Sequence, residues 1–397
     1  MPMHHADPPR RTVLHVIDTL SYAGAQRYVV LLCQWSSRQR FRHIVCVLQP
    51  EIDLKNQLES AGVEVVCLNM PRPSILRLWR FVRYAWCALQ SIMHLCRREG
   101  VDVVQCHLSD AEFLGIAAAV CSRTPVIITT LHGPQMLPCR PWWSARSMLR
   151  RLVTRLLYCC VDHIVAVSAE VALEARRQFR APLSKITTII NRIDTDSYGV
   201  PVDTAAVKAA LGLEPDSRVI TTVSRLEPLK GHACLISALG MLGSQHDDVR
   251  LLLLGEGTSR ADLEDQCRKS GLAERVVFLG TRDDVRAILA VTDIFAFMSF
   301  IEGTSLALME AMAAGRPIVA TDIPGNRTLL SHNKSALLVP AGDAPAMARA
   351  LSELLDDRVA AQALGTEARA FVREYFDIRT TVAELERLWQ PGEVRGV

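Results

Sequence analysis

Short apolar runs alternate with longer amphipathic stretches along the whole chain. In the first half, the runs are rich in Val, Ile and Thr, and they read TVLHVID, HIVCVL, EVVCL, DVVQC, PVIITTL, HIVAVS and TTII. Most of the intervening stretches are long enough for a helix, which is the rhythm of a parallel sheet with helices wound over both faces. The pattern predicts a Rossmann-like α/β domain.

The same rhythm restarts after a break near residue 200. The segment GVPVDTAAV is small and polar, and the runs RVITTVSRL, RLLLLGEG, RVVFLG, DIFAFMS and RPIVATD follow it. Such a break marks a domain boundary. We predict a disordered N-terminus at 1–11, a first Rossmann-like domain at 12–198 and a second one at 199–376.

The last segment, residues 377–397, reads as an amphipathic helix. Its apolar side chains Val382, Leu385 and Leu388-Trp389 recur at helical spacing on one face. We expect this helix to pack back on the first domain.

Length and composition predict a cytoplasmic protein. No apolar run reaches the roughly 18 residues that span a bilayer, and the first residues, MPMHHADPPRRT, lack the apolar stretch of a secretory signal. The 12 cysteines include no C-x-x-C pair, so we expect reduced thiols and no metal site.

Charge is unevenly divided between the two halves. Residues 1–198 carry 24 Lys and Arg against 15 Asp and Glu, which leaves 21 against 27 for the rest. A basic half favours an anionic neighbour, either a membrane surface or a phosphate-bearing acceptor. Nucleic acid is disfavoured because no basic motif interleaved with aromatic residues is present. A surface bias without function explains the counts equally well.

Two stretches of the first half are basic, apolar and aromatic at once. They are ILRLWRFVRYAWCALQSIMHLCRR from Ile75 and RPWWSARSMLRRLVTRLLYCC from Arg140. Both suit a helix that lies on a membrane surface, so the protein could be peripheral on the inner face of the cytoplasmic membrane. The alternative is an ordinary amphipathic helix that covers the sheet with its arginines in solvent.

The sharpest chemical signal is EGTSLALMEAMAAGRPIVATD. Glu302 and Gly303-Thr304 follow an apolar strand, and the pattern predicts a helix from Ser305 to Ala314 that ends at Gly315. A helix that begins at the carboxyl end of a parallel strand offers its free N–H groups to anions such as a diphosphate. Glu302 in the loop and Glu310 in the helix would meet different parts of one ligand.

A second cluster, VSRLEPLKGH, ends the first strand of the second half. It places Arg225 and Lys230 on a loop where two cations can neutralise a pyrophosphate. Either cluster alone is better explained as a solvated surface Arg or Lys and a capping Glu. Their order and spacing together favour a binding site for a diphosphate.

These motifs resemble glycosyltransferase family 4, and the resemblance extends from about Val13 to Trp389. The second half repeats the family's motifs in order: Arg225-Leu226 to Lys230-Gly231, Gly255-Glu256-Gly257, Phe278-Leu279-Gly280, and Glu302 to Pro317. The resemblance implies the GT-B fold, with two Rossmann-like domains whose parallel sheets face each other across a cleft and a C-terminal helix that crosses back. It also implies that the domain at 12–198 binds the acceptor and the domain at 199–376 binds the donor.

The resemblance also implies roles for individual residues. Arg225 and Lys230 would hold the donor diphosphate, and Glu310 would bind the ribose. Glu302 would act on the transferred sugar, together with the backbone of Gly303, Thr304, Ser305 and Leu306. The nucleotide base would rest near Gly255 and Gly280.

Three first-half residues complete the implied site. Gly24 lies in the loop SYAGAQRY, His132 in TLHG would face the donor sugar, and Asn191 lies in TIINRID. A lone His-Gly after a strand also serves to cap a turn, which is the alternative for His132. The chain departs from the family pattern at Ala23, Gln26, Arg192 and Thr328.

Two other patterns are set aside. Asp194-Thr195-Asp196 imitates a D-x-D metal motif, but it is better read as a turn, and we expect no metal or other cofactor. Gly255-Glu256-Gly257 lacks the third glycine and the later acidic residue of a dinucleotide fingerprint, which disfavours a dehydrogenase.

The resemblance therefore implies a retaining glycosyltransferase that uses a nucleotide-diphosphate sugar. The expected acceptor is a lipid-linked glycan of bacterial capsule, exopolysaccharide or lipopolysaccharide synthesis. Two alternatives stay open: a nucleotide-sugar epimerase, against which the R-L-x-x-x-K-G cluster argues, and a non-catalytic sugar-nucleotide sensor.

Overall fold

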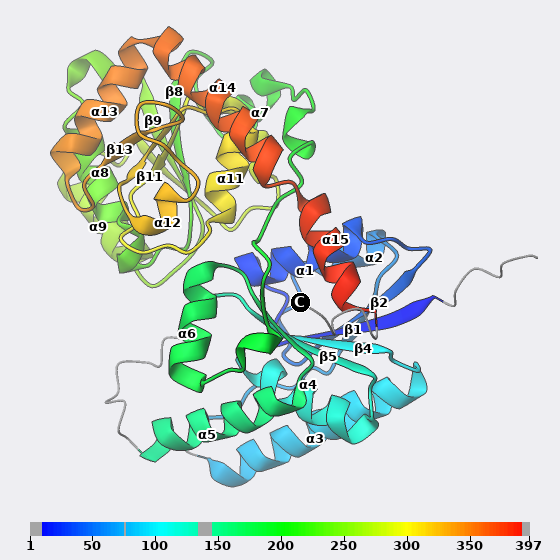
Figure 1. The fold of residues 1–397 in the computed structure, drawn as a ribbon. Coiled ribbons are helices and arrows are strands. Elements are labelled where there is room, and N and C mark those ends of the chain that lie inside the picture. The colour runs from blue at the N-terminus through cyan, green and yellow to red at the C-terminus, as the bar shows by residue number, and fades with distance from the viewer. Residues whose placement is uncertain (1–9, 75–76, 134–144, 391–397) are drawn as a thin grey trace, which may run out of the picture. The chain divides into compact units, whose positions relative to one another are not determined.

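The computed structural model describes residues 10–74, 77–133 and 145–390. The chain divides into two compact units, one formed by residues up to Asn191 together with the segment from Ile378, and the other by Arg192–Asp377 (Figure 1). No helix in the described part of the chain is long and apolar enough to cross a membrane. Residues 1–9 of the expected disordered terminus lie outside the described residues, whereas Arg11 already begins the first strand.

The first unit contains a seven-stranded sheet in the order β3-β2-β1-β4-β5-β6-β7. All neighbouring strands run parallel, which confirms the arrangement that the apolar runs predict. The strands are β1 (Arg11–Ile17), β2 (Phe41–Val47), β3 (Glu64–Cys67), β4 (Val103–His107), β5 (Val126–Leu131), β6 (His163–Ala166) and β7 (Ile186–Thr188).

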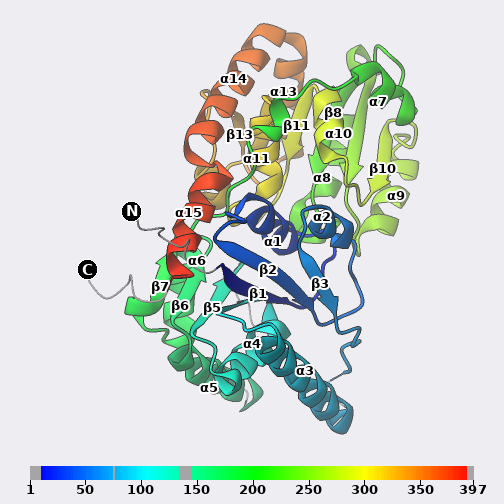
Figure 2. The same cartoon turned by 90° about the vertical axis from the view of Figure 1, so that its right-hand side faces the viewer.

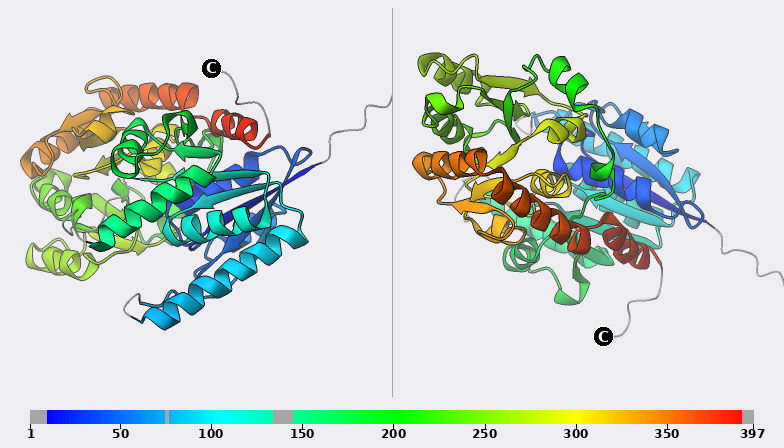
Figure 3. Two further views of the ribbon diagram at one scale, coloured as in Figure 1. Left: turned by 60° about the horizontal axis from the view of Figure 1, so that its bottom comes forward. Right: turned by 90° about the horizontal axis from the view of Figure 1, so that it is seen from above.

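Helices cover both faces of this sheet (Figure 2). One face packs on α1 (Gly24–Trp35), α2 (Lys55–Ser60) and α15 (Ile378–Leu388). The other packs on α3 (Leu78–Arg98), α4 (Ser109–Ser122), α5 (Ala145–Cys160) and α6 (Ala169–Phe179). In this second layer α4 contacts both α3 and α5, and Figure 3 shows the cyan and green helices lying over the strands.

The C-terminal helix α15 belongs to the first unit although it is almost 190 residues from the rest of that unit. Val382, Leu385, Leu388 and Trp389 are buried beside Tyr28 and Leu32 of α1. Their spacing puts them on one face of the helix, as the sequence predicts. Packing of this face on α1 and the sheet gives the helix its position.

The second unit contains a six-stranded parallel sheet in the order β10-β9-β8-β11-β12-β13. Its strands are β8 (Arg218–Val223), β9 (Val249–Leu254), β10 (Val276–Gly280), β11 (Ile294–Phe297), β12 (Ile318–Thr321) and β13 (Leu337–Val339). The helices are α7 (Thr204–Ala210), α8 (His232–Gly240), α9 (Arg260–Lys269), α10 (Val285–Val291), α11 (Leu306–Ala313), α12 (Pro324–Arg327), α13 (Ala344–Asp356) and α14 (Arg358–Tyr375).

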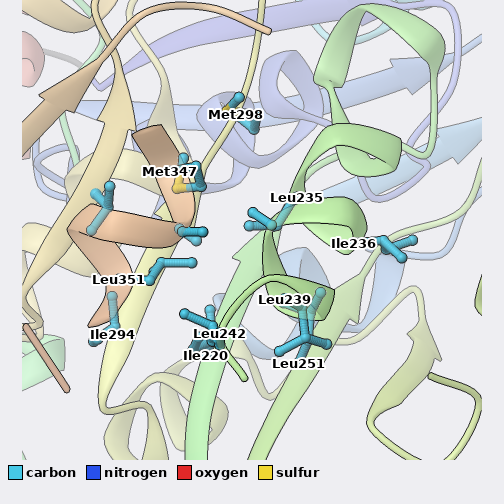
Figure 4. Packing of buried hydrophobic residues seen from close by; sticks show 14 of the residues in the cluster. Ile220, Leu235, Ile236, Leu239, Leu242, Leu251, Ile294, Met298, Met347 and Leu351 are labelled. Carbon is cyan, nitrogen blue, oxygen red and sulfur yellow. The ribbon is translucent and has the colours of Figure 1, made fainter. Parts of the chain in front are cut away.

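The main core of the second unit lies between its sheet and helices α8, α9 and α13. Figure 4 shows side chains of this core, among them Leu235 and Leu239 of α8, Met347 and Leu351 of α13, and Ile220 of the central strand β8. These side chains are almost fully buried. Close packing of this kind fixes the strand ends from which the functional loops leave.

Two details differ from the sequence prediction. Strand β13 is absent from the predicted set, because its three residues form too short an apolar run to be recognised. Residues 192–198, assigned to the first domain from the sequence, lie with the second unit. The reason is a contact with a segment far along the chain: Ile193 forms a β-bridge with Asp377, and Thr195 Oγ1 donates to an Asp377 carboxylate oxygen over 2.8 Å.

Candidate active site

Loops after two neighbouring strands of the second unit bring Lys230 and Glu302 together. Lys230 ends a short turn, Pro228–Lys230, that follows β8, and Glu302 follows β11. Because β8 and β11 are parallel neighbours, their carboxyl ends lie at the same sheet edge. Lys230 Nζ lies 2.6 Å from Glu302 Oε1, and the two side chains are only 19% and 10% exposed. This ion pair is the centre of the candidate site.

The Lys230 loop is held against the end of β11. The Phe300 backbone N–H donates to the Leu229 carbonyl over 2.9 Å, and Ser299 Oγ donates to the same carbonyl over 3.3 Å. At Gly231 the backbone has φ +70°, and a Cβ there would lie 2.1 Å from the Met298 carbonyl oxygen. Only glycine permits both the conformation and the contact.

Helix α11 begins next to Glu302, within one residue of the predicted start. Ser305 caps it by accepting a hydrogen bond from the Leu308 N–H, and Gly303, Thr304 and Leu306 are at least partly exposed around this turn. The first N–H groups of a helix have no partner within it, and the helix dipole adds positive charge there. Glu310 lies in the same helix and is 2% exposed. The helix start can therefore bind an anionic group.

The loop that contains Gly325 packs against the backbone of Glu302. A Cβ on Gly325 would lie 2.3 Å from the Glu302 carbonyl oxygen, so the two backbones touch. Asn326 is fully buried and donates to the Thr321 carbonyl over 2.9 Å, which fixes the turn that carries Gly325. The sequence motif P-G-N contains both residues, but their supporting role becomes visible only in the structure.

Gly255 and Gly280 meet where the loops after β9 and β10 converge. The Gly255 N–H donates to the Gly280 carbonyl over 2.8 Å, and both residues have positive φ, +135° and +67°. A Cβ on Gly255 would lie 2.1 Å from the Ser224 carbonyl oxygen, next to Arg225. Arg225 is exposed, and its guanidinium makes no ion pair with any residue that the structure describes. The group is thus available to an anion.

His132 follows β5 of the first unit. Its Nε2 lies 3.0 Å from His107 Nδ1, and its ring meets the Tyr28 ring edge-on. Burial lowers the pKa of His132 to about 3, so the imidazole is neutral at pH 7. Its Nδ1 is buried and has no hydrogen-bond partner within the described ranges.

Gly24 and Asn191 also belong to the first unit. Gly24 is the exposed first residue of α1. Gln26 of the same helix donates to Thr19 Oγ1 in the preceding loop over 3.0 Å. Asn191 is 7% exposed and ends the first unit's main segment. Its Oδ1 accepts no hydrogen bond from the residues that the structure describes.

Sequence reasoning missed Asp18, which follows β1 beside the Gly24 loop. Its Oδ1 accepts the Ala111 N–H over 2.7 Å at the start of α4. Burial raises the pKa of Asp18 to about 6, and the neighbouring Asp110 adds to the shift. Asp110 is itself paired with Arg72. The position of Asp18 directly after the first strand is the feature of the sequence that could have identified it as a candidate.

Two groups of residues carry side chains of the kind that bind metal ions: the D-x-D segment from Asp194 and a buried group that contains His15. Asp194 Oδ1 accepts hydrogen bonds from the backbone N–H groups of Asp196 and Ser197 over 3.1 and 3.2 Å. These bonds define a turn, as predicted from the sequence. Within the described residues, the side chains of His15, Cys33 and His43 place ligand atoms within 4.8 Å of one another. That group is buried, and two of its members share a hydrogen bond.

Comparisons with known proteins agree with this architecture. The family model "Glycosyl transferases group 1" matches residues 217–357, and "Glycosyltransferase Family 4" matches residues 22–197. The fold and these matches define a glycosyltransferase of the GT-B class. The chain belongs to glycosyltransferase family 4.

Two relatives illustrate the family. The N-acetylgalactosamine-N,N'-diacetylbacillosaminyl-diphospho-undecaprenol 4-alpha-N-acetylgalactosaminyltransferase of Campylobacter jejuni is 25% identical over 91% of this chain and 95% of its own. The UDP-Gal:alpha-D-GlcNAc-diphosphoundecaprenol alpha-1,3-galactosyltransferase of Escherichia coli is 26% identical over 68% of this chain and 71% of its own.

Solved structures share the fold. HepE of Anabaena, in complex with UDP and glucose, superposes with a TM-score of 0.77 at 22% identity, covering 94% of this chain and 98% of its own. WaaG, a glycosyltransferase involved in lipopolysaccharide biosynthesis, superposes with a TM-score of 0.73 at 15% identity, covering 96% and 100%.

Proposed function

We propose that this glycosyltransferase moves a sugar from a nucleotide-diphosphate sugar to a lipid-linked glycan in bacterial cell-surface polysaccharide synthesis. The observation that carries the donor assignment is the Lys230–Glu302 pair at the start of α11, with the exposed Arg225 on the same loop as Lys230. Two cations and a helix N-terminus provide the positive charge that a departing diphosphate needs.

We infer the roles of the site residues from the family resemblance together with their chemistry. Lys230 and Arg225 neutralise the charge that develops on the leaving nucleoside diphosphate as the anomeric carbon becomes cation-like. Glu302 and the backbone from Gly303 to Leu306 hold the transferred sugar, and Glu310 accepts hydrogen bonds from the ribose. Gly255 and Gly280 leave room for the base, and His132 contacts the sugar from the first unit.

We propose retention of the anomeric configuration. The names of both relatives specify alpha-linked products, and one names UDP-Gal as donor. Such donors carry the diphosphate on the α face, so an α product requires retention. The acceptor hydroxyl would attack on the face that the diphosphate leaves.

The proposed acceptor is a polyprenyl-diphosphate-linked glycan, because both relatives are named for acceptors of that kind. This acceptor lies in a membrane, and the first unit has a surface suited to one. On α3, Trp79 and Trp86 are 85% and 61% exposed, two helical turns apart, with the apolar Leu78 and Val82 also exposed between and beside them.

Arginines surround these exposed apolar side chains. Arg77, Arg80 and Arg83 are exposed, and none is ion-paired within the described ranges. On α5, Leu152 and Leu156 are more than half exposed and Arg155 lies beside them. Apolar side chains with unpaired cations fit the interface of an anionic bilayer. The stretches 75–76 and 140–144 of the predicted membrane-binding segments lie outside the described residues.

A donor screen tests the proposal. The pure protein is incubated with UDP-, GDP-, ADP- and dTDP-sugars, with and without a polyprenyl-diphosphate-linked glycan, and released nucleoside diphosphate is measured. Release from one donor with glycan product of the donor's own anomeric configuration is expected. Tight donor binding without release of nucleoside diphosphate under any condition would instead support the hypothesis of a non-catalytic sensor. An epimerised sugar would support the hypothesis of an epimerase.

A further inference from the structure

Four histidines form a continuous hydrogen-bonded chain inside the first unit. His43 Nδ1 lies 2.9 Å from His15 Nε2, and His15 Nδ1 lies 3.3 Å from His107 Nε2. His107 Nδ1 in turn lies 3.0 Å from Nε2 of His132. The first three rings are 0–6% exposed. The chain thus links the proposed sugar-contacting histidine to the interior of the protein.

Strand register explains the arrangement. His43 is level with Val13, His107 is level with Ile17, and His15 lies between these levels on β1. His132 follows two residues after Thr130, the partner of His107. Residues two apart share a face of a sheet, so each histidine stands one step closer to the carboxyl edge than the last. The chain crosses four strands diagonally on the face that α1 and α15 cover.

The inner end of the chain reaches a carboxylate on the C-terminal helix. His43 Nε2 lies 2.9 Å from Ser36 Oγ, and Ser36 Oγ lies 3.3 Å from Glu386 Oε1. Glu386 also accepts the Ser37 N–H over 2.8 Å and is paired with Arg40 at 3.2 Å. A carboxylate with these donors around it can only accept a hydrogen bond from the serine.

This fixed acceptor sets the direction of every bond in the chain. If the Ser36 hydroxyl donates to Glu386, its oxygen accepts from His43 Nε2–H, and each following ring must also carry its proton on Nε2. His132 then donates through Nε2–H to His107 and keeps a bare lone pair on Nδ1. The opposite order would give up the charge-assisted bond to Glu386 and leave a buried N–H on His132 without an acceptor.

The rings are neutral, as this order requires. Burial lowers the pKa of His15 and His107 well below the ordinary range, and it lowers the pKa of His43 to about 4. A neutral imidazole has one donor nitrogen and one acceptor nitrogen, so it transmits the direction of one bond to the next.

We propose that Glu386, acting through Ser36, His43, His15 and His107, holds His132 as the Nε2–H tautomer and presents its Nδ1 as a hydrogen-bond acceptor to a hydroxyl of the bound sugar. The sugar contact rests on the proposed function, whereas the tautomer is a property of the ligand-free protein. Glu386, Ser36 and the three inner histidines are positioning residues.

The test is ¹⁵N NMR of the full chain labelled at histidine, because ring nitrogens with and without a proton give separate signals. His132 is assigned by the signals lost in His132→Asn. We expect a single Nε2–H tautomer for His132 in the natural protein. Ser36→Ala and Glu386→Gln should each give a mixture of tautomers, with kcat several-fold lower and the donor KM little changed.

Matched controls separate positioning from folding. Ser37→Ala keeps the backbone N–H group that donates to Glu386 and should leave the His132 signals unchanged. Ser36→Thr keeps a hydroxyl at position 36 and should show the signals of the natural protein, unlike Ser36→Ala. If Glu386→Gln fails to fold, Ser36→Ala carries the test alone.

Three results would overturn the proposal: an Nδ1–H or doubly protonated His132 in the natural protein, unchanged His132 signals in Ser36→Ala, or a stoichiometric metal at His15, Cys33 and His43 that is lost in Cys33→Ser. If the tautomer is found as proposed but no donor is ever cleaved, the positioning chain stands and only the proposed function falls.

Discussion

Lys230 and Glu302, 72 residues apart in the chain, meet through a contact of 2.6 Å between Nζ and Oε1. Both side chains lie in loops at one edge of the second sheet, and both are mostly shielded from solvent. Each charge therefore lowers the cost of burying the other in the ligand-free protein. A bound diphosphate would offer Lys230 a second anionic partner, and Glu302 would then be free to meet the sugar.

Substitution of Glu302 and substitution of Lys230 should have different effects on nucleotide binding and kcat. Glu302→Gln keeps the shape and leaves Lys230 without its carboxylate, so nucleoside diphosphate should bind at least as tightly while kcat falls by about 10² or more. Lys230→Met should weaken both nucleotide binding and kcat. Calorimetric binding and initial rates measure the two effects. Lys269→Met, which breaks the exposed pair with Asp265, is the matched control, and equal behaviour of Glu302→Gln and this control would contradict the site.

Gly231→Ala should damage the site through the backbone. The new Cβ would lie 2.1 Å from the Met298 carbonyl at φ +70°, so the Lys230 loop must move. We expect at least a 10-fold loss of activity and destabilisation of about 2–3 kcal/mol in urea unfolding. Gly271→Ala has nearly the same φ, +68°, but open space around the Cβ, and should cost only about 1 kcal/mol. Similar losses in the two variants would show that the close contact is unimportant.

Asp18 should make stability depend on pH. Its pKa in the folded protein is about 6, above the ordinary value of 3.8, so folding favours the protonated form. This contribution is complete below about pH 4 and is lost as the pH rises through 6, by up to about 3 kcal/mol for a shift of this size. Asp18→Asn should therefore gain stability relative to the natural protein between pH 4 and 7, as measured by urea unfolding. Asp53→Asn, at an exposed position, serves as the control variant.

Removal of the exposed tryptophans on α3 should weaken membrane binding without changing the fold. Trp79→Ser combined with Trp86→Ser should reduce co-sedimentation with phosphatidylglycerol vesicles by about 10-fold, and salt should weaken binding of the natural protein because exposed arginines are screened. Activity on a soluble acceptor analogue should persist. Val359→Ser removes an apolar side chain that is 79% exposed on α14 and serves as the control. Equal vesicle binding of the natural protein, the double tryptophan variant and Val359→Ser would show that these tryptophans do not contribute to membrane binding.

The strand pattern and the donor motifs could be read directly from the sequence. Twelve of the strands coincide with apolar runs, and α11 begins and ends within a residue of its predicted limits, because Ser305 and Gly315 are cap residues with local effects. The apolar face of α15 was equally clear. Strand β13 was not, because its apolar run is only three residues long. The exact limit of the first unit was not, because it depends on the contact of Ile193 with the distant Asp377.

The histidine chain shows the limit of such a reading. His43 begins an apolar run, His15 interrupts one and His107 follows one, and nothing local distinguishes them from other polar residues of a strand. Their alignment arises from the register of parallel strands, and the carboxylate that orients them comes from α15, 350 residues away from Ser36.

The sequence by itself determined the class of fold, the order of its elements and the donor-binding motifs, because periodicity, caps and short motifs act over a few residues. Only the tertiary structure decided which charges meet, which buried groups share protons and which apolar side chains stay exposed. Those properties depend on distances between segments far apart in the chain. The pairing of Lys230 with Glu302 and the line from Glu386 to His132 are both of this kind.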